Sequence, residues 1–553
     1  MNAPLRTVCW MWMLLLATSE AAVPVIPERV RSSVRQRVDA GYNQGVVVGL
    51  INRDGRDFYS YGTTAVGSAT PPDAETLFEI GSITKVFTTL LLADGVQRGE
   101  VALSGRVQDL MGGTVVVPRR NGEITLEHLA THASGLPVNP DNFCPEVVQP
   151  FECYDATRLE AFLNQYTLSR EPGDVWEYSN LGLGLLGEAL ARRGGVTYEQ
   201  LLAERILNPL GLRDTTGTFP PPPGGGLAQG HSGVVIRPPF RISGLEGAGF
   251  LRSNVSDLLT FLEFQLGFRD SPLAPAVRET HRRRRATAYP GIDIGLGWWL
   301  WGLPGGQVIQ HGGDTPGQTA CIAFHPGRGI GAVVLSNSRF NAYAAVTDLC
   351  LHLLDSQYPL TVIRRPATVS PDVLHAYAGL YKSADGDVFD VSLTHGRLVL
   401  NHFRSDFMFT VYPQDSQRFL GVDVELGPNA NARFASDGDG RVVRMDWFQN
   451  GGTTAYVRQP SPPSLTLTPE SESLRLELSA AIEAPYTIER SQDLDEWQNV
   501  GLPAAGDRTL LVPGTTSLPA FFRVGVRWRN GIERAQGPAR ALPWVDWHSQ
   551  YRH

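Results

Sequence analysis

The stretch EIGSITKVFTT, residues 79–89, places Ser82 three residues before Lys85 at the beginning of a run with apolar residues at helical spacing. Side chains three residues apart on a helix are neighbours, so the hydroxyl and the amine should lie within hydrogen-bond reach. A serine hydroxyl becomes a strong nucleophile when a base takes its proton, and a lysine with a lowered pKa can be that base. The stretch therefore predicts a reactive serine at the N-terminus of a helix.

The chain carries its positive charge almost entirely as arginine, since only two of its 48 Lys and Arg residues, Lys85 and Lys382, are lysines. Arginine does not lose its proton at accessible pH, so it could replace a structural cation at position 85 but not a base or a proton shuttle. The S-x-x-K pattern also occurs by chance in ordinary proteins, although scarce lysine reduces the number of chance matches. Lys382, in LYKSADG, has no comparable partner and is interpreted as a solvated turn residue.

Two later stretches contain further candidate residues: PGDVWEYSNLGLGLLG, residues 172–187, contains Tyr178, and QHGGDTPG, residues 310–317, contains His311. Taken singly, Tyr178 would be interpreted as a core aromatic residue and His311, before two glycines, as a turn histidine. In this order, however, the three stretches resemble the serine β-lactamase and penicillin-binding protein superfamily. They are most similar to its class C β-lactamase-like branch, which includes D-aminopeptidases, D,D-peptidases and family VIII carboxylesterases.

The resemblance spans about residues 25–355 and implies a role for each residue of the reacting centre. Ser82 would be the nucleophile and form an acyl-enzyme, and Lys85 would accept or relay its proton. Tyr178 would act as a base toward Ser82 and as an acid toward the leaving group, which requires nearby positive charge to lower its pKa from about 10. The backbone N–H groups of Ser82 and Asp314 would form the oxyanion hole, where one donor typically contributes about 3 kcal/mol.

The resemblance also implies a set of substrate-binding residues. Asn180 would hydrogen-bond Lys85 and the substrate amide. His311 stands where many relatives have the lysine of a K-T-G motif, and Gly312 and Gly313 would let substrate approach that strand edge closely. A lysine is a fixed cation suited to a β-lactam carboxylate, whereas histidine is mostly neutral at pH 7. The H-x-G pattern is more similar to that of D-aminopeptidases, related peptidases and esterases than to that of true β-lactamases.

These observations favour a serine hydrolase acting through an acyl-enzyme on Ser82, as a peptidase or amidase on short peptides that can contain D-residues. A carboxylesterase is the first alternative and a β-lactamase the second. An alternative of another class is a penicillin receptor that is acylated without turnover, because Ser82, Lys85 and Tyr178 do not distinguish turnover from trapping. The expected partner is a small-molecule or short-peptide substrate, no cofactor is expected, and the oligomeric state is left open.

Two histidines of the stretch EHLATH, His128 and His132, have the i, i+4 spacing of a metal-binding pair on a helix. No glutamate follows His128 in the zincin manner, and no third ligand is evident in the sequence. We therefore interpret both histidines as structural and expect no metal.

The net charge of the chain and its N-terminal segment indicate which partners it can bind and where it is located. A formal net charge of −8 over 553 residues argues against a phosphate-backbone partner, so no nucleic acid is expected. Residues 1–22 resemble a signal peptide, with Arg6 before the apolar run VCWMWMLLLA and a cleavage site near Ala21. No other stretch reaches about 18 continuous apolar residues, so the mature protein is expected to be periplasmic or extracellular, without a membrane span.

Four cysteines remain after this cleavage. Cys144 and Cys153 close a short loop, and an oxidising compartment would favour a disulfide between them, with two free thiols as the alternative. Cys321 and Cys350 lie in apolar contexts and are predicted to be plain core residues.

Pattern changes along the chain predict three folded parts. Residues 23–362 have strands at both ends and helices in the middle, which indicates an α+β fold, and the resemblance implies the antiparallel sheet with helices of β-lactamases and penicillin-binding proteins. Residues 370–458 show short alternating runs and resemble the lipocalin-like barrel of some related peptidases. Residues 464–530 resemble a small β-sandwich module of exported bacterial proteins, and residues 531–553 form a tail without a clear period.

Overall fold

The computed structural model describes most of the chain up to residue 459 and only strand segments beyond it. The described residues are 22–143, 151–219, 226–339, 341, 343, 345–403, 405, 407–422, 426, 430–459, 465–469, 473–478, 486–491, 498–501, 509–513 and 521–526. The chain divides into two compact units, Met1–Arg365 and Pro366–His553, each described here by itself. The predicted signal-peptide residues 1–21 and the predicted tail 531–553 lie outside the described residues.

The first unit is built on an eight-stranded antiparallel sheet with the strand order β2-β1-β12-β11-β10-β9-β8-β7. Its strands are β1 (Gly45–Asn52), β2 (Gly55–Gly62), β7 (Arg285–Ala286), β8 (Ile292–Ile294), β9 (Trp299–Leu303), β10 (Gly306–Asp314), β11 (Thr319–His325) and β12 (Ile330–Ser336). Strands β1 and β2 form an N-terminal hairpin, and β1 pairs with β12, so the strands predicted at both ends of the unit meet in one sheet. The expected α+β fold is confirmed.

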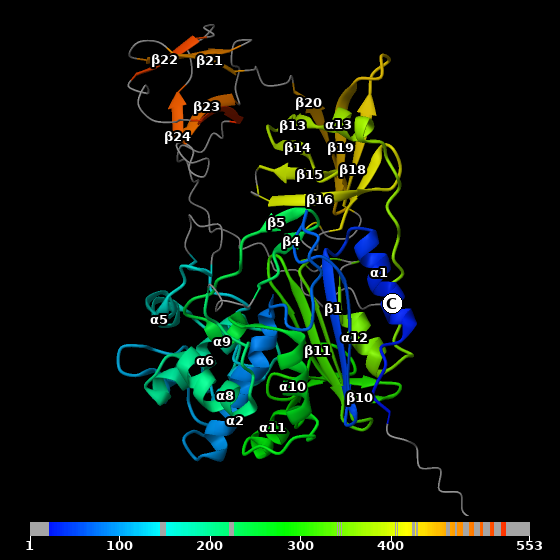
Figure 1. The fold of residues 1–553 in the computed structure, drawn as a ribbon. Helices are drawn as coiled ribbons and strands as arrows, with labels where there is room; N and C mark the ends of the chain where they lie inside the picture. Colours follow the sequence, from blue (N-terminus) through cyan, green and yellow to red (C-terminus); the bar gives the residue numbers. More distant parts are fainter. Residues whose placement is uncertain are drawn as a thin grey trace, which may run out of the picture. The chain divides into compact units, whose positions relative to one another are not determined.

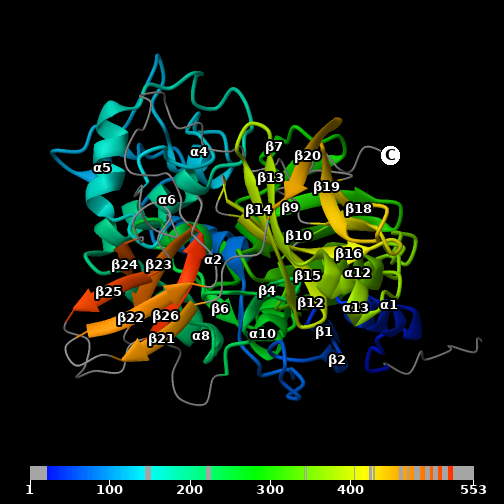
Figure 2. The ribbon, with the colours of Figure 1, turned by 90° about the horizontal axis from the view of Figure 1, so that it is seen from above.

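Both faces of this sheet are covered by helices, as Figures 1 and 2 show. Successive side chains of a strand point to opposite faces, and in β1 Val47 belongs to one core cluster while Val46 and Val48 belong to the other. The first cluster includes residues of α2 (Thr84–Gln97), α10 (Val255–Gln265) and α11 (Ala274–Thr280). The second includes residues of α1 (Glu28–Asp39) and α12 (Thr347–Leu354). The sheet is therefore the middle of three layers, which explains its continuous apolar strands.

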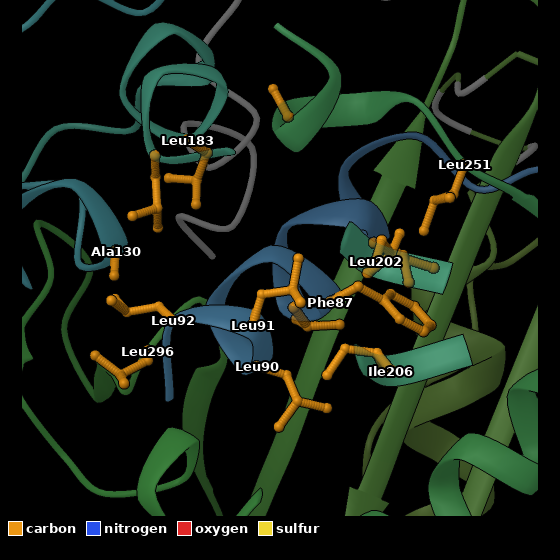
Figure 3. Packing of buried hydrophobic residues seen from close by; sticks show 14 of the residues in the cluster. Phe87, Leu90, Leu91, Leu92, Ala130, Leu183, Leu202, Ile206, Leu251 and Leu296 are labelled. Carbon is orange, nitrogen blue, oxygen red and sulfur yellow. The ribbon is translucent and has the colours of Figure 1, made fainter. Parts of the chain in front are cut away.

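Helix α2 is buried on all sides, with every residue from Thr84 to Gly95 buried. Its apolar side chains pack against α4 (Leu126–Ala130), α6 (Asn180–Gly194), α7 (Tyr198–Leu202) and the segments around them (Figure 3). The buried threonine hydroxyls of α2 donate hydrogen bonds to backbone carbonyl oxygens, Thr84 to that of Gly81 and Thr88 to that of Gly247. A 3-10 turn, Gly81–Ile83, precedes the helix, so Ser82 lies at the N-terminus as predicted.

Helix α6 follows directly on the segment that contains Tyr178. Its N-cap is Ser179, whose Oγ accepts a hydrogen bond from the N–H of Gly182 at 2.8 Å. Gly195 ends it in the left-handed conformation with φ 68°, the conformation that glycine adopts without strain. The N-cap at Ser179 thus fixes where α6 begins, directly after Tyr178, and Gly195 fixes where it ends.

The second unit begins with α13 (Pro371–Tyr377), followed by an eight-stranded closed barrel. Its strands are β13 (Gly379–Ser383), β14 (Val388–Thr394), β15 (Arg397–His402), β16 (Phe407–Pro413), β17 (Arg418–Gly421), β18 (Asn431–Ser436), β19 (Val442–Gln449) and β20 (Gly452–Arg458). Closure comes from β20 pairing with β13, with Tyr381 opposite Arg458. Aromatic side chains such as Phe389, Phe434 and Trp447 form its core, which confirms the predicted barrel.

Six further strands, described as backbone, form two three-stranded antiparallel sheets. One has the order β21-β22-β25 and the other β24-β23-β26, with bounds Leu465–Pro469 (β21), Ser473–Leu478 (β22), Tyr486–Ser491 (β23), Gln498–Gly501 (β24), Thr509–Pro513 (β25) and Phe521–Val526 (β26). The predicted all-β character of this part is confirmed. Across the described part of the chain, no helix combines the length and the apolar character that crossing a bilayer requires.

Candidate active site

The three stretches singled out in the sequence converge on Ser82. The 3-10 turn before α2 leaves Ser82 partly exposed between the buried residues Gly81 and Ile83. Ser82 Oγ lies 2.8 Å from Lys85 Nζ and 2.8 Å from Tyr178 Oη. The spacing argument for Ser82 and Lys85 therefore gives the observed contact. The contact with Tyr178 joins positions 96 residues apart.

Lys85 is fully buried, with 0% of its surface exposed. Its Nζ donates to the carbonyl oxygen of Ala248, on α9 (Glu246–Gly249), at 2.7 Å, and lies 5.0 Å from the centroid of the Tyr178 ring. Burial disfavours the charged form of the amine and holds the pKa of Lys85 well below its usual value. The structure thus favours a neutral amine beside the serine hydroxyl, which is the form that can accept a proton.

The pKa of Tyr178 corrects one sequence-based expectation. We expected positive charge on Lys85 to lower it, but burial raises the pKa of the Tyr178 phenol well above its usual value. The hydrogen bond with Ser82 lowers this pKa and the charge of Asp314 raises it, but burial has the largest effect. Because the buried amine is itself driven toward the neutral form, it supplies little positive charge to the phenol. Tyr178 therefore rests as a neutral phenol, able to donate its proton.

The end of β10 packs directly against the turn that contains Ser82. A Cβ atom on Gly313 would lie 1.9 Å from the carbonyl oxygen of Ile80 and 3.0 Å from the backbone nitrogen of Ser82. A Cβ atom on Gly81, whose φ is +46°, would lie 2.8 Å from the nitrogen of Asp314. Glycine is required at both positions because backbone meets backbone. This contact brings the N–H groups of Ser82 and Asp314, the two proposed oxyanion donors, next to each other.

His311 is 2% exposed and lies two residues before Gly313, on the same face of β10. Its Nδ1 lies 2.5 Å from the carbonyl oxygen of Gly312, and since a carbonyl only accepts, Nδ1 carries the proton. Its ring lies edge-on to that of Trp299, with centroids 6.5 Å apart. Trp299 also stacks on Tyr178 at 6.3 Å, so one indole contacts both site residues.

Asn180 is the first residue of α6, directly after its N-cap. Its side-chain Nδ2 donates to Oδ1 of Asn139 at 3.0 Å, and its backbone N–H donates to the carbonyl oxygen of Val138 at 2.8 Å. We expected Asn180 to hydrogen-bond Lys85, whereas the second acceptor of Lys85 is the carbonyl oxygen of Ala248. Asn180 thus fastens the start of α6 to the segment at residues 138 and 139.

Comparison with known proteins decides the family. A family model described as beta-lactamase matches residues 30–352, more than half of the chain. The chain belongs to the β-lactamase family. It is therefore a serine hydrolase of the acyl-transfer type, related to β-lactamases and D-alanyl-D-alanine carboxypeptidases.

Among curated relatives, the D-alanyl-D-alanine-carboxypeptidase/endopeptidase AmpH of Escherichia coli strain K12 is 30% identical over 326 residues, which cover 55% of this chain and 82% of AmpH. Penicillin-binding protein 4* of Bacillus subtilis strain 168 is 26% identical over 420 residues, covering 69% and 90% of the two chains. Among solved structures, a class C β-lactamase from Rhodobacter sphaeroides has a TM-score of 0.52 and 26% identity, covering 59% and 99%. An octameric penicillin-binding protein homologue from Pyrococcus abyssi shares the fold, with a TM-score of 0.54, 21% identity and coverage of 77% and 99%.

Sequence reasoning missed two carboxyl side chains near the reacting centre of this β-lactamase family member, those of Asp314 and Glu79. Asp314 was predicted only as a backbone donor, yet its Oδ1 accepts from Thr319 Oγ1 at 2.6 Å, and desolvation raises the pKa of this carboxyl to about 7. Glu79 is buried, and its two oxygens accept from the N–H of Phe240 and from Thr315 Oγ1, each at 2.6 Å. Glu79 is three residues before Ser82 and Thr315 directly follows Asp314, so this carboxylate links the two sides of the oxyanion site.

The remaining predicted residues have structural surroundings. Cys153 is disulfide-bonded, but Cys144, its predicted partner, lies outside the described residues. Cys321 and Cys350 are buried free thiols, as predicted for core residues. His128 belongs to a capping box at the start of α4, where its Nδ1 accepts the N–H of Thr125 at 3.3 Å. Among the described residues, no group of three or more His, Cys, Asp or Glu side chains could hold a metal ion.

Proposed function

We propose that this member of the β-lactamase family is an exported serine peptidase or amidase that hydrolyses short peptides, including peptides with D-residues, through an acyl-enzyme on Ser82. The observation that carries the proposal is the position of Ser82 Oγ, 2.8 Å from both Lys85 Nζ and Tyr178 Oη. The serine thus contacts one group that can accept its proton and another that can donate one.

In the acylation step, Ser82 Oγ attacks the carbonyl carbon of the substrate while its proton moves to the neutral amine of Lys85. The oxyanion that forms accepts hydrogen bonds from the N–H groups of Ser82 and Asp314. As the bond to the leaving amine breaks, Tyr178 donates its phenolic proton to that amine. The ammonium of Lys85 then returns a proton to the Tyr178 phenolate, which restores both groups to their resting forms.

Deacylation uses the same groups with water in the position of the leaving amine. Water attacks the ester carbonyl of the acyl-enzyme while its proton moves to the neutral amine of Lys85, relayed by the Tyr178 hydroxyl. The Ser82 oxygen leaves and regains a proton, and the carboxylic acid product is released. The step depends on where water can bind, so turnover and a trapped acyl-enzyme share the same resting geometry.

The preference for peptides is supported by His311 and by one relative. A neutral histidine provides less attraction for a β-lactam carboxylate than the fixed cation of a K-T-G lysine. The relative AmpH is named as a carboxypeptidase and endopeptidase. Other relatives are named as β-lactamases, for example that of Pseudomonas fluorescens at 26% identity, so β-lactam hydrolysis is an alternative alongside ester hydrolysis.

Export is proposed on the signal-like residues 1–22 and on the disulfide at Cys153, since disulfides persist in oxidising compartments. The proposed domain bounds are 23–362 for the catalytic domain, 370–458 for the barrel and 464–530 for the last module. The intact mass of the exported protein should correspond to a chain that begins after Ala21.

A substrate panel tests the proposed activity. Purified protein is assayed with D- and L-aminoacyl p-nitroanilides, p-nitrophenyl esters and nitrocefin, and we expect turnover of an anilide with Ser82→Ala inactive on all of them. Hydrolysis of nitrocefin or esters alone would instead support the lactamase or esterase alternative. Mass spectrometry after exposure to penicillin identifies the receptor alternative, which predicts a persistent adduct on Ser82 without turnover of any substrate. Activity retained by Ser82→Ala would refute the assignment of the nucleophile.

A further inference from the structure

His132 occupies a strained and enclosed position close to the reacting centre. Its φ is +55°, in the left-handed region that is uncommon for residues other than glycine, and only 1% of its surface is exposed. Neighbouring hydrogen bonds hold this conformation, because the N–H of Ala133 donates to the carbonyl of His128 at 2.8 Å and the N–H of Gly173 donates to the carbonyl of Ala133 at 2.7 Å. A left-handed conformation is strained for a residue other than glycine, and such strain is typical of residues with a functional role.

Three contacts of His132 converge on the segment that contains Tyr178. Its carbonyl oxygen accepts the N–H of Glu177 at 2.8 Å, and its Nδ1 accepts the N–H of Ser179 at 3.0 Å. Its ring lies against the Tyr178 ring, with centroids 4.5 Å apart and planes inclined by 30°. The residues before and after Tyr178 are thus both hydrogen-bonded to His132, and the phenol ring between them lies against the imidazole.

The hydrogen bonds identify the tautomer of His132. The N–H of Ser179 can only donate, so Nδ1 is the acceptor and the proton is on Nε2. Burial lowers the pKa of His132 well below its usual value, so the ring stays neutral. Nε2 is buried and has no hydrogen-bond partner. A phenylalanine would fill the space without this unsatisfied N–H, so the useful part of the histidine is the acceptor at Nδ1.

We propose that His132 is a positioning residue for Tyr178, which holds the phenol at hydrogen-bond distance from Ser82 by accepting the flanking Ser179 N–H at Nδ1. This inference rests on the proposed role of Tyr178 in proton transfer. His132 acts through Tyr178 and touches neither Ser82 nor the substrate in the mechanism. Displacing the phenol by even 1 Å would weaken proton transfer strongly.

Paired variants separate the acceptor from the ring. His132→Phe keeps a ring and removes the acceptor, whereas His132→Asn removes the ring, keeps an acceptor near the position of Nδ1 and tolerates positive φ. With the aminoacyl p-nitroanilide that the wild-type protein hydrolyses fastest as the probe, because its leaving amine must be protonated, we expect His132→Phe to lower kcat about tenfold or more with KM changed less than about twofold, and His132→Asn to recover most of kcat. If His132→Phe yields no folded protein, His132→Gln replaces it, because its amide extends past the Nδ1 position. His128→Gln is the matched control, since glutamine preserves the capping box of α4 and activity should be unchanged.

A double-mutant cycle tests the route of the effect. In a Tyr178→Phe background no phenolic proton remains to be positioned, so the acceptor-removing substitution at His132 should cost less than about twofold in the acylation rate. The same loss in both backgrounds would overturn the inference, as would a failure of His132→Asn to recover activity. If Tyr178→Phe by itself leaves the rate unchanged, the proposed role of Tyr178 fails instead, so the two failures can be told apart.

Discussion

At the scale of single residues, the choice of lysine at position 85 follows from proton transfer. Lys85 is 0% exposed and its pKa is lowered by burial, whereas Lys382, the other lysine of the chain, is exposed. A buried guanidinium would keep its charge, because arginine does not lose its proton at accessible pH. Scarcity of lysine in the sequence therefore points to the position where an amine that can lose its proton is needed.

Replacement of this amine gives a direct test. We expect Lys85→Arg to lower the rate of Ser82 acylation by about 10²- to 10⁴-fold, because a general base is lost and a permanent cation takes its place. The acylation rate is measured by stopped-flow with p-nitrophenyl acetate, and the matched control Lys382→Arg should react at the unchanged rate. A Lys85→Arg protein that acylates normally would show that another group accepts the serine proton.

Spacing in the sequence was sufficient to predict the pair Ser82 and Lys85, because one helical turn fixes their distance. The protonation of Tyr178 could not be predicted in this way. Its pKa depends on how completely the fold excludes water from the phenol, and that exclusion comes from residues such as His132 and Trp299, distant in the sequence. The same holds for Glu79, whose partner Thr315 is 236 residues away.

At the scale of elements, the site is a junction between the turn before α2 and the end of β10. Gly313 lets these two backbones touch, since a Cβ atom there would lie 1.9 Å from the carbonyl oxygen of Ile80. The sequence predicted a close approach of substrate to this glycine, and the structure shows a close approach of the protein's own backbone. Either approach requires a residue without a side chain at position 313. The local sequence pattern could therefore identify the glycine, but it could not identify the Ile80 backbone as the group that packs against it.

Gly313→Ala should separate the two sides of the oxyanion site. Neither backbone partner can move as a flexible side chain would, so we expect β10 to shift away from Ser82 and kcat/KM to fall about tenfold or more. Gly302→Ala, in the adjacent strand β9, is the matched control, because its nearest neighbour would be at an ordinary contact distance of 3.7 Å and activity should be unchanged. Steady-state kinetics on the best substrate of the panel give both values, and normal kcat/KM for Gly313→Ala would contradict the assigned junction.

At the scale of the whole molecule, the cores of the two units draw on separate parts of the chain. The two clusters on either side of the large sheet use residues between Ile26 and Leu360, and the barrel cluster uses residues between Val369 and Tyr456. Each core can be encoded by local apolar periodicity, and this is why a change of pattern between residues 362 and 370 is a signal that the sequence can carry. Which strands neighbour one another, such as β1 beside β12, depends on long-range packing and was not predictable from local patterns.

The separate cores lead to a prediction about truncation. A chain that ends at Arg365 keeps both clusters of the large sheet, the contact of Tyr42 Oη with the Arg364 carbonyl at 2.9 Å, and every proposed site residue from Ser82 to Asp314. We therefore expect it to unfold cooperatively and to acylate Ser82 with p-nitrophenyl acetate within about twofold of the full-length rate, because a domain with its own core folds alone. Circular dichroism during thermal unfolding and stopped-flow kinetics measure the two properties. A truncated protein that folds but fails to acylate would show that residues after 365 contribute to the reacting centre, and activity lost only toward peptides would assign them to substrate binding.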